Sequence, residues 1–222
     1  MRSSHYFGIG LASMAMISPV MVALIAVSSV TLSPNDVASG ASSTGTVNLD
    51  LTAKAPVTVQ LSTSTPAVAT VPASVTVGGK SRQATFPVSS VTGSAGCSLI
   101  SAHFGTTATR SALLYVEPPT PNPNLKLTLS ANTTIGGSSV TGSLLVTVNS
   151  SFPATTVQLV GSTEHVTVPA SVTLRLIEGG IGVATFNIGT STVPGQTCAV
   201  ITATHNGVQS RALLKLNPFI FG

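Results

Sequence analysis

Residues Val71-Pro72-Ala73-Ser74-Val75-Thr76 occur a second time as Val168-Pro169-Ala170-Ser171-Val172-Thr173. Other segments recur in the same order, since Thr31-Leu32-Ser33 matches Thr128-Leu129-Ser130, and Ala84-Thr85-Phe86 matches Ala184-Thr185-Phe186. A match that keeps its order over a long stretch indicates an internal repeat rather than chance. The sequence therefore contains one unit written twice, which we place at residues 29–117 and 125–217.

Apolar and polar residues alternate within each repeat. Val47, Leu49 and Leu51 are separated by polar residues, and the same alternation returns at Leu144 and Val146. Such a period of two places one face of a strand on a core and the other in water. Segments of this kind recur about every 8–12 residues between Gly, Pro, Ser and Asn, a spacing typical of sandwiches. The pattern predicts an all-β chain with two tandem immunoglobulin-like β-sandwiches.

Residues 118–124 separate the repeats and are rich in proline. Proline-rich segments favour an extended conformation of about 3.1 Å per residue, so this linker predicts a stiff spacer of roughly 25 Å. We expect the sandwiches to follow one another as a rod. After the second repeat, residues 218–222 form a short apolar tail.

The N-terminal segment is hydrophobic. Arg2 precedes a run from Phe7 to Val30 that has no charged residue. The run resembles a secretory signal, and it is also long enough for a membrane span of about 20 residues. We expect residues 1–28 to form a hydrophobic helix, either as a signal peptide cut before Ser29 or as a retained anchor. Both alternatives place the repeats outside the membrane, in an extracellular or cell-surface location.

Composition argues against several classes of function. Charged residues make up 6% of the chain, with nine Lys and Arg, five Asp and Glu, and four His. Nucleic-acid binding needs clustered basic residues, so no nucleic-acid partner is expected. Acids and histidines are too few and too scattered to predict an enzyme, a metal site or a cofactor. Cys97 and His103 would lie some 20 Å apart on one strand, too far for a catalytic dyad; His165 and His205 are expected at the surface.

Cys97 and Cys198 occupy matching positions in the two repeats. Ile100 and Ala102 are expected to face the core, so Cys97 should point to the opposite face of its strand. A disulfide needs Cα atoms within about 7 Å, whereas matching positions in consecutive sandwiches lie a domain length apart. We expect two partly buried thiols; an intermolecular disulfide and an intramolecular disulfide remain as alternatives.

Two other groups of residues are candidates for contact or modification. Asn132 and Asn149 begin N-glycosylation sequons, which are used only if the host glycosylates exported proteins. Phe219, Ile220 and Phe221 form an apolar cluster, which either packs on the second repeat or contacts a partner.

The motifs of the repeats also carry a resemblance. The segments "STPAVATVPASVTV", "ATFPV" and "ISAHFG" within a unit of this length resemble the bacterial immunoglobulin-like repeats of invasin- and intimin-type surface proteins. The resemblance covers nearly all of the chain after residue 28. It implies an extracellular β-sandwich that serves as a stalk, spacer or adhesion unit.

Together these features predict a non-catalytic structural or adhesion module of the cell surface. Its partner would be a protein or a cell-surface polymer, and self-association is an additional expectation. The alternative is a pilin-like filament subunit, in which residues 7–30 are retained as a helical filament core. In that case alone the chain would contact the membrane through this segment.

Overall fold

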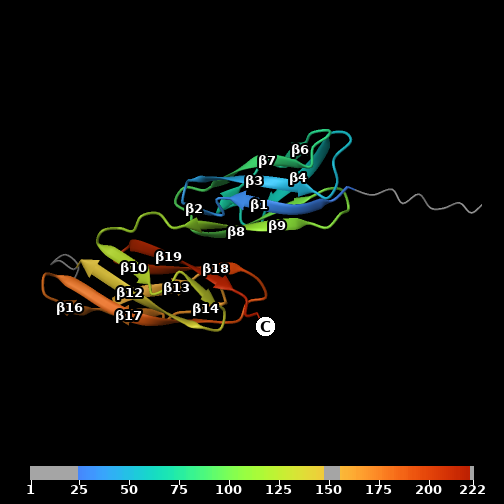
Figure 1. Cartoon of the computed structure of the whole chain (residues 1–222). Helices are drawn as coiled ribbons and strands as arrows, with labels where there is room; N and C mark the ends of the chain where they lie inside the picture. The colour runs from blue at the N-terminus through green and yellow to red at the C-terminus, as the bar shows by residue number, and fades with distance from the viewer. Residues whose placement is uncertain (1–24, 148–155, 221–222) are drawn as a thin grey trace, which may run out of the picture.

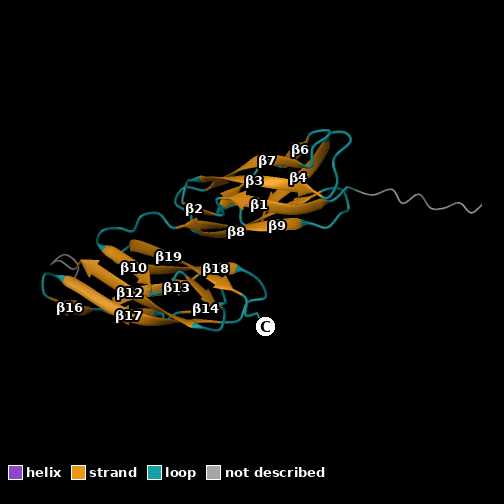
Figure 2. Ribbon diagram, in the orientation of Figure 1, coloured by secondary structure: helices purple, strands orange, loops and turns teal. Residues whose placement is uncertain are grey.

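The computed structural model describes residues 25–147 and 156–220, which consist of strands, turns and loops (Figures 1 and 2). No helix within these ranges is long and apolar enough to cross a membrane. The helix predicted for the N-terminal segment falls, up to residue 24, outside the described residues.

Strands β1 to β9 form two sheets. The first sheet has the order β1 (Val27–Ser33), β3 (Ser42–Leu49), β7 (Gln83–Ser90) and β5 (Ala69–Thr70). The second has the order β2 (Asp36–Ala38), β9 (Arg110–Glu117), β8 (Gly96–His103), β4 (Val57–Thr63) and β6 (Ser74–Val77). We call this pair of sheets the first sandwich.

Strands β10 to β19 repeat the arrangement. One sheet has the order β10 (Leu125–Leu129), β12 (Ser139–Thr147), β17 (Ile181–Thr190) and β14 (Val166–Thr167), and β16 (Arg175–Ile177) also pairs with β17. The other has the order β11 (Thr133–Ile135), β19 (Val208–Asn217), β18 (Thr197–His205), β13 (Thr156–Gly161) and β15 (Ser171–Thr173). We call this pair the second sandwich.

The strand order identifies both units as immunoglobulin-like. Such sandwiches place the first, second and fifth main strands on one sheet and the third, sixth and seventh on the other. Strands β1, β3 and β7 lie opposite β4, β8 and β9 in this way, and β10, β12 and β17 lie opposite β13, β18 and β19. Strands β2 and β11 are short and pair in parallel with β9 and β19. The predicted pair of β-sandwiches is therefore confirmed for the described residues, whereas the predicted N-terminal helix is wrong at Val27 and Ser28, which belong to β1.

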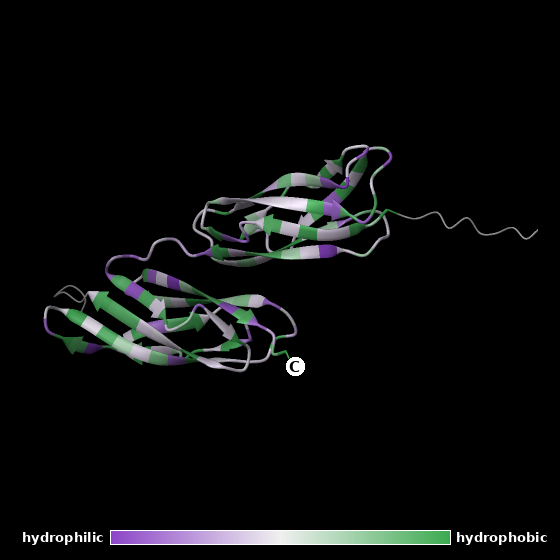
Figure 3. Cartoon of the chain, in the orientation of Figure 1, coloured by the Kyte–Doolittle hydropathy of each residue, from purple (hydrophilic) through white to green (hydrophobic). Residues whose placement is uncertain are grey.

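Each sandwich has its own hydrophobic core between its two sheets. The alternation of apolar and polar residues is visible along the strands in Figure 3. In the first sandwich, Val47 and Phe86 from one sheet meet Val59 and Ile100 from the other. The core of the second sandwich is built at matching positions.

A glycine faces a phenylalanine across neighbouring strands in both sandwiches. Gly45 on β3 is opposite Phe86 on β7, and Gly142 on β12 is opposite Phe186 on β17. A Cβ atom added to Gly45 would lie 2.2 Å from Cζ of Phe86, and one added to Gly142 would lie 2.3 Å from Cζ of Phe186. Both residues recur in the sequence repeat because the buried phenylalanine ring occupies the space that a side chain at the glycine position would need.

We expect Gly45→Ala to lower the free energy of unfolding by about 1–3 kcal/mol, because the added methyl group overpacks the buried ring of Phe86. Chemical denaturation followed by circular dichroism measures the change. Gly78→Ala is the matched control in the same sandwich, since a Cβ there meets nothing within 4 Å. Equal effects of the two substitutions would contradict the proposed packing.

The two sandwiches lie side by side rather than end to end (Figure 1). The linker reverses at Asn122, where the backbone N–H of Leu125 donates to the Asn122 carbonyl oxygen at 3.1 Å. The N–H of Asn124 donates to Oδ1 of Asn122 at 2.9 Å. The expectation of a rod with a stiff spacer was therefore wrong. Prolines favour extended backbone, but a proline such as Pro123 also suits the second position of a β-turn.

Strand β1 begins before the predicted cleavage position. Val27 is buried and pairs with Leu49, and the N–H of Ala26 donates to Oδ1 of Asp50 at 2.8 Å. A cut before Ser29 would remove this buried residue from the core of the first sandwich. Cleavage at that position stays a prediction.

Candidate functional site: the interface between the sandwiches

The interface is formed by the outer faces of two hairpins, β8–β9 and β18–β19. On β8, Ile100 and Ala102 face the core, so Cys97 and Leu99 point outward as the sequence predicted. A small hydrophobic cluster, separate from both cores, contains buried Tyr115, Cys198 and Leu213. The partly buried residues packed against this cluster are Cys97, Leu113 and Val200. Side chains from both sandwiches thus share one apolar contact.

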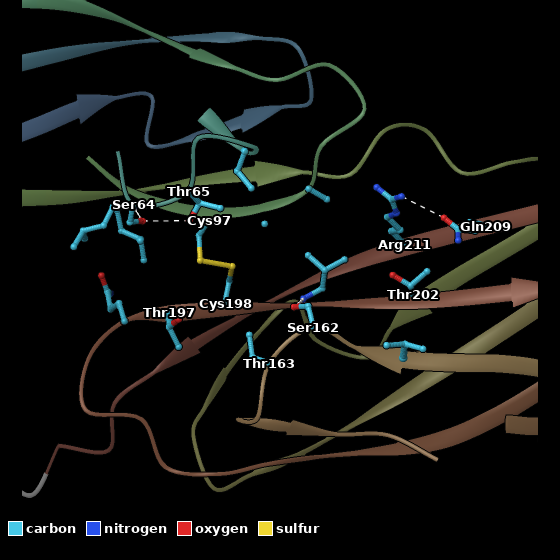
Figure 4. Close-up of a pocket in the computed structure, with 18 of the residues that line it drawn as sticks. Ser64, Thr65, Cys97, Ser162, Thr163, Thr197, Cys198, Thr202, Gln209 and Arg211 are labelled. Carbon is cyan, nitrogen blue, oxygen red and sulfur yellow. Dashed lines mark hydrogen bonds between the residues drawn. A yellow bond between two sulfur atoms is a disulfide. The ribbon is translucent and has the colours of Figure 1, made fainter. Parts of the chain in front are cut away.

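A disulfide between Cys97 and Cys198 crosses this contact (Figure 4). The two Cα atoms are 6.0 Å apart, and both cysteines of the chain are used. The structure therefore contradicts the expectation of free thiols or an intermolecular bond. That expectation assumed that a stiff linker keeps matching positions a domain length apart, whereas the turn at Asn122 brings them together.

Matching positions of the two repeats meet at the interface. Cys97 is opposite Tyr115 on its hairpin, and Cys198 is opposite Lys215 at the same place on the other. Hydrogen bonds behind the contact are also repeated. The hydroxyl of Ser64 accepts from the N–H of Leu99 at 2.9 Å, and that of Ser162 accepts from the N–H of Val200 at 2.8 Å. Each sandwich therefore presents the same face to the other, as in a two-fold dimer.

One ionic cluster breaks this symmetry. Lys215 of the second sandwich contacts Oδ2 of Asp36, and its Nζ lies 3.0 Å from Oε1 of Glu117, both in the first sandwich. The same Nζ lies 5.0 Å from the centre of the Tyr115 ring, within the range of a cation–π contact. Asp36 and Glu117 belong to β2 and β9, which pair in parallel, so the carboxylates converge on the cation.

The ionic cluster shifts the titration of two of its members. Burial lowers the pKa of Lys215, but hydrogen bonds to Asp36 and Glu117 and their negative charges outweigh burial and raise it above its ordinary value. Burial raises the pKa of Tyr115, and the positive charge of Lys215 opposes this only in part. Lys215 is therefore a cation and Tyr115 a neutral phenol at neutral pH.

A cleft of about 840 Å³ lies beside the disulfide, between the two sandwiches (Figure 4). Its walls combine hydroxyl groups with apolar side chains, and Leu99 and Val160 are both solvent-exposed. Arg211 is the one charged residue among those that line it. Nη1 of Arg211 donates to the carbonyl oxygen of Gly93 in the first sandwich at 3.1 Å, and Nη2 donates to Oε1 of Gln209 at 3.2 Å.

The lining of the cleft holds few ionisable groups. Its lining contains no carboxylate and no histidine, so it offers no paired acid and base. The described residues contain no group of three His, Cys, Asp or Glu that could hold a metal ion. The prediction that His205 lies at the surface was wrong, because β18 turns its side chain inward and buries it. Its Nδ1 lies 3.3 Å from the carbonyl oxygen of Thr156.

The other predicted site residues that the structure describes do not line the cleft. Asn132 is exposed next to β11, and its glycosylation stays a prediction. Phe219 and Ile220 are 54% and 82% exposed, and contact with a partner stays a prediction. Asn149 and Phe221 lie outside the described residues.

Sequence reasoning missed the ionic cluster, although the repeats carried a signal for it. Tyr115 and Lys215 occupy matching positions in the two hairpins but differ in chemistry. The charged Glu117 is likewise replaced by Asn217 in the second repeat. Positions at which otherwise similar repeats differ in charge would have pointed to contacts made by only one of them.

We expect the docked arrangement to loosen at alkaline pH in a Cys97→Ser/Cys198→Ser chain. The pKa of Lys215 is higher in the docked state than its ordinary value of 10.5. Its contribution is therefore complete below that value and is lost as the pH rises through the raised pKa. Small-angle scattering at pH 8 and above pH 11, with circular dichroism as a check on folding, measures the opening. A chain with the same two cysteine substitutions and Lys215→Arg should stay docked at both pH values. Equal opening of the two cysteine-free chains would contradict the role of Lys215.

No protein-family model and no curated protein matches the chain. Among solved structures, it is similar to the D0-D1 domain of intimin, with 15% identity, a TM-score of 0.36, and coverage of 86% of this chain and 99% of that one. The adhesin InvE of Yersinia pseudotuberculosis gives 14% identity and a TM-score of 0.34, over 85% of this chain and 58% of that one. The Escherichia coli adhesin FdeC gives 17% identity and a TM-score of 0.36, over 87% of this chain and 64% of that one.

The chain thus spans less than two thirds of the InvE and FdeC structures. These neighbours are of the invasin and intimin type to which the sequence motifs pointed. The strand order of the two sandwiches identifies the fold.

Proposed function

We propose that the chain is a non-catalytic structural or adhesion module of the extracellular surface. The observation that carries the proposal is the pair of immunoglobulin-like sandwiches joined by a disulfide between Cys97 and Cys198. Disulfides form and persist in oxidising compartments, so this bond supports an exported chain. The hydrophobic run before β1 supports the same location.

The chemistry of the interface supports a non-catalytic role. Both thiols are oxidised, so neither cysteine is a nucleophile. The lining of the cleft offers hydroxyl groups, apolar side chains and one guanidinium, which suit binding of a protein or polymer rather than bond cleavage. The side-by-side arrangement favours a compact adhesion unit over an extended stalk.

The pilin-like alternative has no support in the described residues. It needs a helix that is continuous to Val30, but Val27 and Val30 are strand residues in the core of the first sandwich. Whether residues 1–24 are removed or retained is measured by the intact mass of the protein from its native host.

Protease treatment of intact cells and a deletion strain test the proposal together. Intact native cells are treated with a protease, and the released peptides are identified by mass spectrometry; we expect peptides from both repeats. The deletion strain should attach less to surfaces or to other cells, and the full chain should restore attachment. Recovery of the protein from the cytoplasm with reduced cysteines, or normal attachment by the deletion strain, would overturn the proposal.

A further inference from the structure

We propose that the cleft beside the disulfide binds an extended peptide that carries a carboxylate, supplied by a partner protein of the surface. The inference rests on the proposed surface function and names the class of ligand for the same cleft. Three features of the cleft carry it. These are a cation that has no acidic partner, the length of the lining, and side chains that differ from those on the matching face of the first repeat.

Arg211 is the charged group that the cleft presents to a ligand. Its side chain is half-buried, and the ion pairs of the described residues belong to Lys215 and not to Arg211. Two of the five N–H groups of its guanidinium donate to Gly93 and Gln209, and both acceptors are neutral. The remaining N–H groups and the positive charge therefore suit an anionic ligand group. A carboxylate accepts charge-assisted hydrogen bonds from a guanidinium, which are stronger than neutral ones.

The cleft is long enough for an extended chain. Its lining follows β18 from Thr197 to Thr204, a distance of about 24 Å at the rise of an antiparallel strand. Figure 4 shows Ser64 and Thr197 toward one end of the cleft and Arg211 toward the other. An extended peptide of about seven residues covers this distance. A compact ligand would not contact both ends.

The second repeat has side chains here that the first repeat lacks. Val160, Thr202 and Arg211 lie side by side on β13, β18 and β19. The matching row on β4, β8 and β9 consists of Ser62, Ser101 and Ser111. Because the same fold forms with serines, neither the valine nor the arginine is needed to build the sheet. Val160 is 63% exposed, and with Leu99 on the other sandwich it offers apolar contact to a ligand.

The remaining groups of the lining favour a peptide over a polysaccharide. The lining contains no aromatic ring against which a sugar could stack. The hydroxyl groups of Thr202 and Thr204 and the side-chain amides of Gln196 and Gln209 can both donate and accept hydrogen bonds, as the backbone of an extended peptide requires. Main-chain hydrogen bonds supply affinity in such complexes, and alternate side chains supply specificity. The peptide should therefore combine one acidic residue with aliphatic residues.

The test uses two libraries of capped seven-residue peptides and the purified, oxidised protein. Both libraries are built from valine, threonine and serine; one carries a single glutamate, and the other carries glutamine at the same positions. Fluorescence anisotropy measures the dissociation constants. We expect the best glutamate peptides to bind about tenfold more tightly than their glutamine counterparts, the factor that one charge-assisted hydrogen bond supplies. Equal binding of the two libraries, or no binding of either, would overturn the proposal.

Substitutions locate the binding in the cleft. Arg211→Gln should remove the preference for glutamate, whereas Arg175→Gln, the same change on β16 outside the cleft, should keep it. Val160→Ser introduces the residue type of the first repeat and should weaken binding of both libraries equally. Because Arg211 also contacts Gly93, small-angle scattering checks that the sandwiches stay docked in each variant. A preference for glutamate that persists in the Arg211→Gln chain would overturn the assignment of the carboxylate to this residue.

Failure of this proposal is distinguishable from failure of the proposed surface function. Peptide binding is measured on the purified protein, whereas the surface function is tested by the attachment of the deletion strain. Loss of attachment without peptide binding would leave adhesion standing and overturn the ligand class. Binding of an acidic oligosaccharide such as oligogalacturonate, without binding of the peptides, would likewise overturn it.

Discussion

Pulled from its two ends, the oxidised chain is expected to extend by 101 residues less than the reduced chain, because Cys97 and Cys198 are separated by that number of residues. At about 3.6 Å per extended residue, the difference amounts to roughly 360 Å.

The reason is the path that force takes through the molecule. Tension that enters at residue 25 reaches Cys97 and passes through the disulfide directly to Cys198. The segment between them includes the proline-rich linker and strands β9 to β17, and it carries no load while the bond is intact. This segment therefore cannot be extended while the disulfide is intact, whereas β18 and β19, which follow Cys198, carry the load.

Single-molecule force spectroscopy on a chain of residues 25–222, held by handles at both ends, measures the effect with and without reductant. The Cys97→Ser/Cys198→Ser chain is the control and should show the long extension under both conditions. An extension of the unmodified chain that does not depend on reductant would contradict the load path through the disulfide.

The second large effect is on thermodynamic stability. We expect the Cys97→Ser/Cys198→Ser substitution to lower the free energy of unfolding by as much as about 4.7 kcal/mol, the value that chain entropy gives for a closed loop of roughly 100 residues. The bond restricts the unfolded chain, and it also holds the sandwiches together when one of them opens. Urea denaturation followed by circular dichroism should show a lower midpoint and less coupling between the two sandwiches.

A matched control lies on the same hairpin. Ser101 and Ser111 share a hydrogen bond of 2.9 Å on the exposed part of β8 and β9. Replacing both with alanine removes a polar pair without touching the second sandwich, and should cost less than about 1 kcal/mol. If the cysteine and serine pairs had equal effects, the disulfide would not be the stabilising link that the structure indicates.

Local sequence patterns predicted the sheets well. The alternation at Val47 and Leu49 placed these residues in the core, and the matched segments of the two repeats became matched strands. The outward direction of Cys97 followed from the same period of two. Patterns of this kind succeed because the direction of a side chain on a strand depends on its immediate neighbours in the sequence.

Predictions about the relation between the repeats failed for a physical reason. The prolines of the linker indicated extended backbone. The direction of the chain depends instead on the turn at Asn122, which is stabilised by only a few hydrogen bonds. The partner of Cys97 depends on that direction. Burial of His205 likewise depends on contacts with residues distant in sequence, such as Thr156.

The sequence by itself determined two immunoglobulin-like sandwiches, their cores and the faces that their strands turn outward, because these follow from local periodicity and from the repeat. Only the tertiary structure decided that the outward faces of β8–β9 and β18–β19 meet, that Cys97 bonds to Cys198, and that Lys215 lies between Asp36 and Glu117. These contacts join residues about 100 or more positions apart. A local sequence pattern cannot predict such contacts, because these residues come together only when the two folded sandwiches dock.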